Sequence, residues 1–339
     1  MTVATIPREF IWRRVHSLMG LWLVLFLIEH LLTNSQAALW IGEDGSGFIR
    51  MVNALHNLPY LQAIEFFLLG VPLLIHLVLG VKYALTAKSN AHKTKGESPS
   101  LRSYGRNRAY SWQRITSWIL LIGLIGHVVK FRFLEYPLNI SHGTYQEYFV
   151  KLDMDDGLYT LASRLSVNLY DAKAIENAEK DFEQRDDEKA LLEAATLMQT
   201  ENKNYLNGVQ SVPFEMQKEM ILQSAQKYRL KEKWIDTVKK FHLKDNQVIA
   251  ESKSFGTATL LSVRDVFKSP VYIALYTIFV IATCFHAFNG LWTFLLTWGL
   301  VIRRAAQKSL LTVSISLIVI LTLLGLSSVW GTFWFNLRH

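Results

Sequence analysis

Five long apolar stretches interrupt the 339-residue chain, and they constrain its fold more than any other feature. A helix needs about 20 apolar residues to cross roughly 30 Å of hydrocarbon. The stretches that meet this length are Val15–Leu32, Ala63–Leu85, Trp112–Val129, Val271–Leu291 (extending toward Trp298) and Leu310–Trp330. Lipid leaves no water to bond an exposed backbone, so we predict an all-α fold, a bundle of five transmembrane helices.

Basic residues in the short segments beside the spans set the predicted orientation. They precede the first span, separate the second from the third, and separate the fourth from the fifth: Arg8, Arg13, Arg14, Lys82, Lys88, Lys93, Lys95, Arg102, Arg106, Arg108, Arg114, Arg303, Arg304 and Lys308. Five crossings put all three clusters on one side, which is cytoplasmic by the positive-inside rule. We therefore predict a cytoplasmic N-terminus and an extracytoplasmic C-terminus. Topology accounts for the net charge of +8, so we expect acidic lipid headgroups and no nucleic acid as partners.

A polar block separates the third span from the fourth and divides the chain into three parts. Residues 1–134 hold the first three spans, residues 135–268 form an insertion, and residues 269–339 hold the last two spans. Within the insertion, Asp171–Gln199 and Phe214–Lys244 have apolar residues three or four apart, which predicts helices. The crossing count places this helical insertion outside the cytoplasm.

Each of the first four spans carries one histidine: His30, His76, His127 and His286. An ionisable residue inside a span is costly and indicates function, although one such histidine alone is better explained by a hydrogen bond to a neighbouring helix. Counting along alternating spans places His30 with His127 in the outer half and His76 with His286 in the inner half, very roughly 10–18 Å apart. Facing imidazoles can close both axial positions of a haem iron. We therefore predict two haem groups for electron transfer.

Two further patterns bear on these haems. Gly80, Gly123 and Gly290 each lie four residues from one of the histidines, on the same helix face. They predict either flat space for a macrocycle or close helix–helix contacts. No Cys-x-x-Cys-His motif occurs, so we expect the haem to be haem b, held without a covalent bond.

Around these histidines the sequence resembles the di-haem cytochrome b558 subunits of Bacillus-type succinate dehydrogenases, which are succinate:menaquinone oxidoreductases. The matching stretches cover nearly all of the membrane part: Arg8–Gly20, Leu25–Asn34, Leu58–Gly80, Thr86–Asn90, Trp112–Thr116 and Phe285–Gly299. In that family the histidines of helices one and three bind the outer haem and those of helices two and four the inner haem. The insertion departs from the family, which has a short loop at this point.

The resemblance implies an electron-transfer subunit of respiratory complex II with no succinate-oxidising site of its own. Its partners would be a flavoprotein subunit and an iron–sulfur subunit, both on the cytoplasmic face of a bacterial inner membrane. Electrons would pass from the iron–sulfur subunit through the two haems to a membrane quinone, menaquinone by family preference.

Four residues are weaker candidates for cofactor binding. Arg14 and His16, at the inner boundary of the first span, would pair with haem propionates or line a quinone site, or Arg14 is only a topology anchor. His56 and Glu65, near the outer end of the second span, would bind quinone or handle its protons. The alternative for this second pair is a loop histidine and a snorkelling carboxylate.

Two functions of other classes remain open on these observations. A haem-free structural anchor would use its histidines for packing hydrogen bonds, but it does not require matched depths. A histidine-relay transporter would predict internal repeats and broken helices at the midplane, and no repeat is evident in the sequence. A visible absorption spectrum distinguishes the haem protein from both.

Overall fold

The computed structural model describes residues 6–38, 43–86, 105–142, 145–184, 189 and 212–338. Within these ranges five helices are long and apolar enough to cross a membrane, and each contains one of the predicted spans: Arg8–Ala38, Leu61–Thr86, Asn107–Leu134, Pro270–Thr297 and Arg304–Asn336. The prediction of a five-span helical protein is confirmed. Four basic residues used for the orientation, Lys88, Lys93, Lys95 and Arg102, lie outside the described residues.

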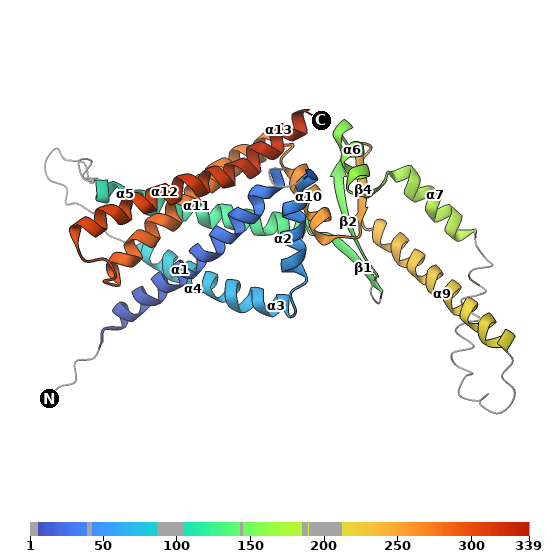
Figure 1. Ribbon diagram of the computed structural model, residues 1–339, viewed down its shortest axis with the longest axis horizontal. Coiled ribbons are helices and arrows are strands. Elements are labelled where there is room, and N and C mark those ends of the chain that lie inside the picture. The colour runs from blue at the N-terminus through green and yellow to red at the C-terminus, as the bar shows by residue number, and fades with distance from the viewer. Residues whose placement is uncertain are drawn as a thin grey trace, which may run out of the picture. The chain divides into compact units, whose positions relative to one another are not determined.

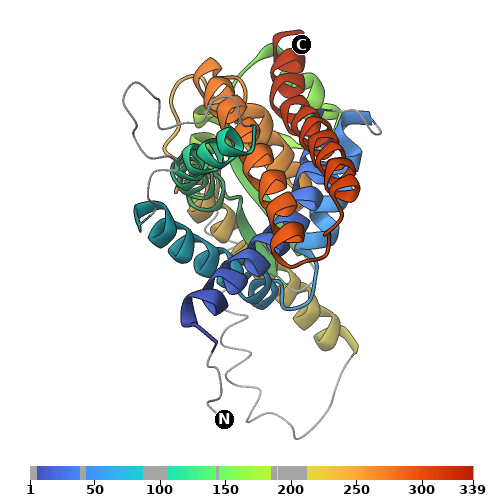
Figure 2. The same ribbon diagram turned by 90° about the vertical axis from the view of Figure 1, so that its left-hand side faces the viewer.

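The helices of the spans pack as one compact unit formed by residues 1–134 and 263–339. Their elements, in chain order, are α1 (Arg8–Ser35), η1 (Gln36–Ala38), η2 (Glu43–Gly45), α2 (Ser46–His56), α3 (Leu61–Ile64), η3 (Glu65–Gly70), α4 (Val71–Thr86), α5 (Gly105–Val128), η4 (Val129–Leu134), α11 (Pro270–Thr297), α12 (Arg304–Leu326), η5 (Ser327–Gly331) and α13 (Thr332–Arg338). Helix α1 contacts α4, α11 and α12, and α5 contacts α11. Figures 1 and 2 show α11 and α12 side by side, joined by a short turn.

Pro72 interrupts the second span, and the surrounding chain compensates for it. Proline has no N–H to donate, so the carbonyl four residues earlier loses its helical partner. That carbonyl belongs to Leu68 in the π-helical turn η3, and it accepts a hydrogen bond from Nε1 of Trp22 on α1 at 2.5 Å. The carbonyl freed by the proline is thus satisfied by a hydrogen bond between two spans, as is required of backbone polar groups in lipid.

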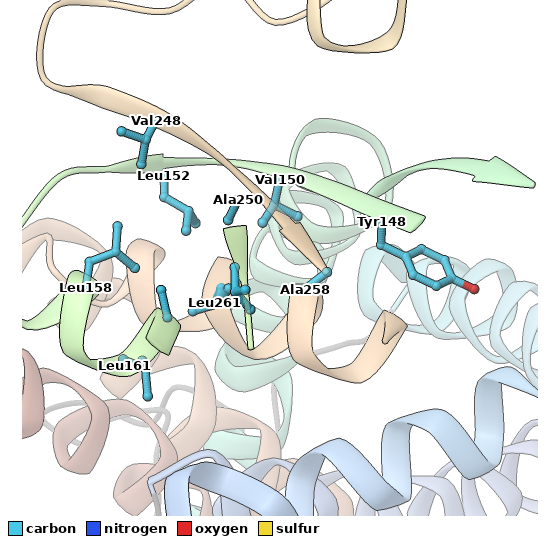
Figure 3. Close-up of a cluster of buried hydrophobic side chains, with 11 residues drawn as sticks. Tyr148, Val150, Leu152, Leu158, Leu161, Val248, Ala250, Ala258 and Leu261 are labelled. Atoms are coloured by element: carbon cyan, nitrogen blue, oxygen red, sulfur yellow. The ribbon is translucent and has the colours of Figure 1, made fainter. Parts of the chain in front are cut away.

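Residues 135–262 form a second compact unit. Its strands are β1 (Leu138–His142), β2 (Tyr145–Asp153), β3 (Asn168–Tyr170) and β4 (Gln247–Ser252), and they pair antiparallel in the order β1-β2-β4-β3. One face buries Tyr148, Val150, Leu152, Val248 and Ala250 together with side chains of α6 (Asp156–Arg164) and the first part of α10 (Phe255–Val266), as Figure 3 shows. The other face buries Phe149 and Ile249 against α7 (Ala172–Glu183) and α9 (Val212–Val238).

The insertion was predicted to be helical, and it is helical only in part. Helices α7 and α9 fall in the predicted stretches, whereas the four-stranded sheet was not predicted. The reason is that both faces of β2 are covered, so the strand contains the continuous apolar run Tyr148-Phe149-Val150. A strand buried on both sides lacks the alternation that identifies a strand in a sequence. The end of the predicted stretch Asp171–Gln199, beyond Gln184, lies almost wholly outside the described residues.

Candidate haem sites

Four helices bring the four histidines together in two pairs. His30 on α1 faces His127 on α5, with ring centroids 5.8 Å apart and an interplanar angle of 88°. His76 on α4 faces His286 on α11, with ring centroids 6.4 Å apart and an interplanar angle of 85°. These are the two pairs expected from their depths in the sequence.

The spacing within each pair fits a shared iron. Two nitrogens that bind one metal from opposite sides lie about 4 Å apart, because each metal–nitrogen bond is about 2.0–2.1 Å long. The centroids of the two imidazole rings then lie roughly 6 Å apart. The observed 5.8 and 6.4 Å both lie close to this value.

The hydrogen-bond partners of Nδ1 determine which ring nitrogen of the inner pair, His76 and His286, can bind a metal. Nδ1 of His76 lies 3.0 Å from the carbonyl oxygen of His16, and a carbonyl can only accept, so Nδ1 carries the proton. Nδ1 of His286 lies 3.3 Å from Oγ1 of Thr116. In His76 the Nε2 lone pair is therefore free to bind a metal, since a ligating histidine usually bonds its other nitrogen to a neighbouring acceptor.

The outer pair, His30 and His127, has different neighbours at Nδ1. Nδ1 of His127 lies 3.2 Å from the hydroxyl of Tyr276, which can accept a hydrogen bond from it. Nδ1 of His30 lies 3.4 Å from Nδ2 of Asn34, an amide nitrogen that can only donate and that also donates to the carbonyl oxygen of His30 at 2.8 Å. In the part of the chain that the structure describes, no hydrogen bond reaches Nε2 of any of the four rings.

A metal bound by side chains alone does not fit these pairs. Zinc sites typically have three or four protein ligands. Among the described residues, no group of three or more His, Cys, Asp and Glu side chains is placed to hold a metal ion. Two facing imidazoles suit a metal whose other positions are already filled by a macrocycle, as in haem.

Arg14 and His16 lie beside the inner pair, and each has a defined contact. The His16 ring stacks on His76 with centroids 4.1 Å apart, and its Nε2 atom is buried without a hydrogen-bond partner among the described residues. Arg14 donates to the carbonyl of Thr297 at 2.7 Å and lies over the ring of Trp298. Arg14 therefore binds the C-terminal end of α11, where a cation is favoured by the helix dipole.

His56 and Glu65 lie near each other, and Arg132 of η4 joins them. Arg132 forms an ion pair with Glu65 at 2.8 Å, with both side chains about two-fifths exposed. Burial lowers the pKa of His56, opposed by nearby Glu65 and reinforced by nearby Arg132. Arg132 is not among the residues predicted above, although a basic residue five positions after His127, at the end of the same span, is a signal in the sequence.

Gly80, Gly123 and Gly290 do not leave open, flat space beside the histidines in this structure. A Cβ at Gly123 would clash with the Phe279 ring, at Gly80 it would lie 3.4 Å from His16, and at Gly290 3.7 Å from Gln113. Of the three, Gly123 permits a close helix–helix contact, the second of the two predicted roles, whereas a Cβ at Gly80 or Gly290 would make an ordinary contact. A fourth glycine, Gly20, does pack on a paired histidine, because a Cβ there would lie 2.8 Å from Cε1 of His76.

Comparison with known proteins gives one informative match. A stretch of 126 residues is 39% identical to the succinate dehydrogenase cytochrome b558 subunit of Bacillus subtilis (strain 168). The match covers 37% of this chain and 56% of that protein, so the chain spans about half the length of the curated relative. No family model and no solved structure matches. The resemblance to cytochrome b558 subunits is confirmed.

Proposed function

We propose that this chain is the membrane subunit of a succinate:quinone oxidoreductase and transfers electrons from an iron–sulfur subunit through two haem b groups to a membrane quinone. The observation that carries the proposal is the pair of histidines at each of two levels, whose ring centroids, 5.8 and 6.4 Å apart, are spaced to share one iron. The similarity to a cytochrome b558 subunit supports it. Haem held by these histidines would supply reversible one-electron iron chemistry.

The chain's own residues have distinct tasks in this proposal. His76 and His286 hold the haem nearer the cytoplasm, and His30 and His127 hold the haem nearer the outer face. The flavoprotein and iron–sulfur subunits dock on the cytoplasmic face beside the basic segments, and succinate oxidation takes place outside this chain. Residues 135–268 then form an extracytoplasmic domain between the membrane parts 1–134 and 269–339.

The quinone, menaquinone in this proposal, binds near the outer pair. A second haem is useful mainly if the acceptor lies on the far side of the membrane from the iron–sulfur subunit. Glu65, His56 and Arg132 lie at that end of the bundle, where a carboxylate paired with a guanidinium can hold and pass the protons that quinone reduction takes up. His16 and Arg14 serve the inner site, with Arg14 holding α1 to α11.

Spectroscopy of purified variants tests the haem assignment. The wild-type chain should show a b-type spectrum, two haems per polypeptide, and full extraction of haem into acid acetone. His76→Ala or His286→Ala should remove the inner haem, and His30→Ala or His127→Ala the outer one. A folded wild-type chain without haem would favour the structural anchor or the transporter, and two haems in the double variant of His76 and His286 would refute the ligand assignment.

A second experiment tests the side on which quinone is reduced. Moving one charge across the membrane involves about 2.3 kcal/mol per 100 mV, so electron transfer to an outer site responds to the membrane potential. Succinate-to-quinone activity of the whole complex in sealed vesicles should therefore change when an uncoupler collapses the potential. If activity is indifferent to the uncoupler and a quinone-site inhibitor perturbs only the inner haem, quinone binds near Arg14 and His16 instead.

A further inference from the structure

The side chain opposite Nδ1 of His286 is a threonine whose own proton is already committed. Thr116 is buried in α5, and its Oγ1 lies 2.8 Å from the carbonyl oxygen of Trp112 and 3.2 Å from that of Gln113. Carbonyl oxygens only accept, so the hydroxyl proton points to the helix backbone. Toward Nδ1 of His286, 3.3 Å away, the same oxygen can offer only a lone pair.

This geometry determines which nitrogen of His286 carries the proton. Because Oγ1 of Thr116 accepts, Nδ1 of His286 must donate, and the lone pair of the ring is then on Nε2. Nε2 is then the nitrogen available to a metal shared with His76, whose ring centroid lies 6.4 Å from that of His286. If the side chain at this position could not accept a hydrogen bond from Nδ1, the proton of His286 could lie on either ring nitrogen. With the proton on Nε2, the ring could not bind a metal through that atom.

A second bond from α5 fixes the backbone of the same histidine. Nε2 of Gln113 donates to the carbonyl oxygen of His286 at 3.0 Å, and Oε1 of Gln113 accepts from Asn289 at 2.8 Å. Gln113 and Thr116 lie three positions apart, on one face of α5. One face of α5 therefore holds both the main chain and the ring of His286, although the partner ring, His76, comes from α4.

We propose that Thr116 is a positioning residue for the inner haem: it fixes the tautomer and orientation of His286, while Gln113 anchors the backbone of this histidine. The inference rests on the proposed function, since it concerns a haem ligand. The outer pair has no equivalent, because Nδ1 of His127 faces a phenol whose proton is not bonded elsewhere among the described residues. Nδ1 of His30 faces the amide nitrogen of Asn34, which donates instead of accepting. Loss of the hydroxyl should therefore affect one haem and spare the other.

Three variants of the full-length chain separate the hydroxyl from the rest of the side chain. Thr116→Val keeps the shape and removes the acceptor, and Thr116→Ser keeps the acceptor. Ser117→Ala is the matched control, because Ser117 is the next residue on α5 and, among the described residues, its hydroxyl bonds only to the carbonyl of Arg114. The measurements are haem content, electron paramagnetic resonance of the two low-spin haems, and the rate of haem transfer to apomyoglobin.

Thr116→Val should transfer its inner haem about 10–100-fold faster than the wild-type chain, with an altered inner-haem resonance and an unchanged outer haem. Thr116→Ser and Ser117→Ala should match the wild type, and the outer haem reports that each variant is folded. The proposal is overturned if Thr116→Val matches the wild type, if it loses both haems, or if Thr116→Ser is as defective as Thr116→Val. A wild-type chain without haem would instead refute the proposed function itself.

Discussion

Gly20 is the position at which one added methyl group should disturb one haem site and leave the other intact. A Cβ at this position would lie 2.8 Å from Cε1 and 3.2 Å from Nδ1 of His76, whereas ordinary contacts begin at 3.4 Å. The ring must therefore move by about 0.6 Å. It cannot move freely, because the His16 ring stacks on it at 4.1 Å.

The displacement is large compared with what the site tolerates. Functional groups must typically be held within about 0.5 Å of their working geometry. A shift of about 0.6 Å along the 3.0 Å bond from Nδ1 to the His16 carbonyl would exceed the usual hydrogen-bond range of about 2.7–3.2 Å. Overpacking costs about 1–3 kcal/mol, and alanine recovers about 1 kcal/mol of helix propensity. The variant Gly20→Ala should therefore fold with a specific defect at His76.

The assay is haem stoichiometry and the visible spectrum of purified Gly20→Ala, with Gly126→Ala as control. Gly126 lies beside His127, but a Cβ there would meet no atom within 4 Å, so this variant should keep both haems. Gly20→Ala should lose the inner haem or show a shifted inner-haem spectrum, with the outer haem unchanged. If Gly20→Ala retains both haems with a wild-type spectrum, the packing of Gly20 on His76 does not govern the inner site.

Three further predictions concern the remaining parts of the molecule. Replacing residues 137–262 by a short flexible linker should preserve both haems, because no paired histidine lies in that unit; loss of both from a membrane-inserted variant would contradict this. Tyr170→Phe removes the 2.6 Å hydrogen bond to buried Glu251, so it should lower stability by about 1–3 kcal/mol, seen as a lower thermal midpoint of the insertion with unchanged haem content. Burial lowers the pKa of His56, so the unfolded chain binds more protons than the folded one, and stability should fall as pH drops below 6.5 toward the folded pKa. The variant His56→Gln should flatten that part of a profile of thermal midpoint against pH. An unchanged slope would show that His56 does not contribute to the pH dependence of stability.

Several features of this protein follow from its sequence alone. The five spans were predictable because bilayer thickness fixes the length of an apolar helix. The pairing of His30 with His127 and of His76 with His286 was also predictable, because a constant rise per residue converts a position in the chain into a depth. Neither inference requires knowing which side chains touch.

The tertiary structure decided how each helix is rotated and what surrounds each ring. Depth does not specify the neighbours of Nδ1, so Thr116 and Tyr276 emerge only when α5 and α11 pack together. The ion pair of Arg132 with Glu65 joins residues 67 positions apart. The sheet of the insertion was hidden because helices cover both of its faces. Length and depth are properties of a single helix in lipid, whereas ring orientation, ion pairs and sheet pairing depend on contacts between segments distant in the sequence.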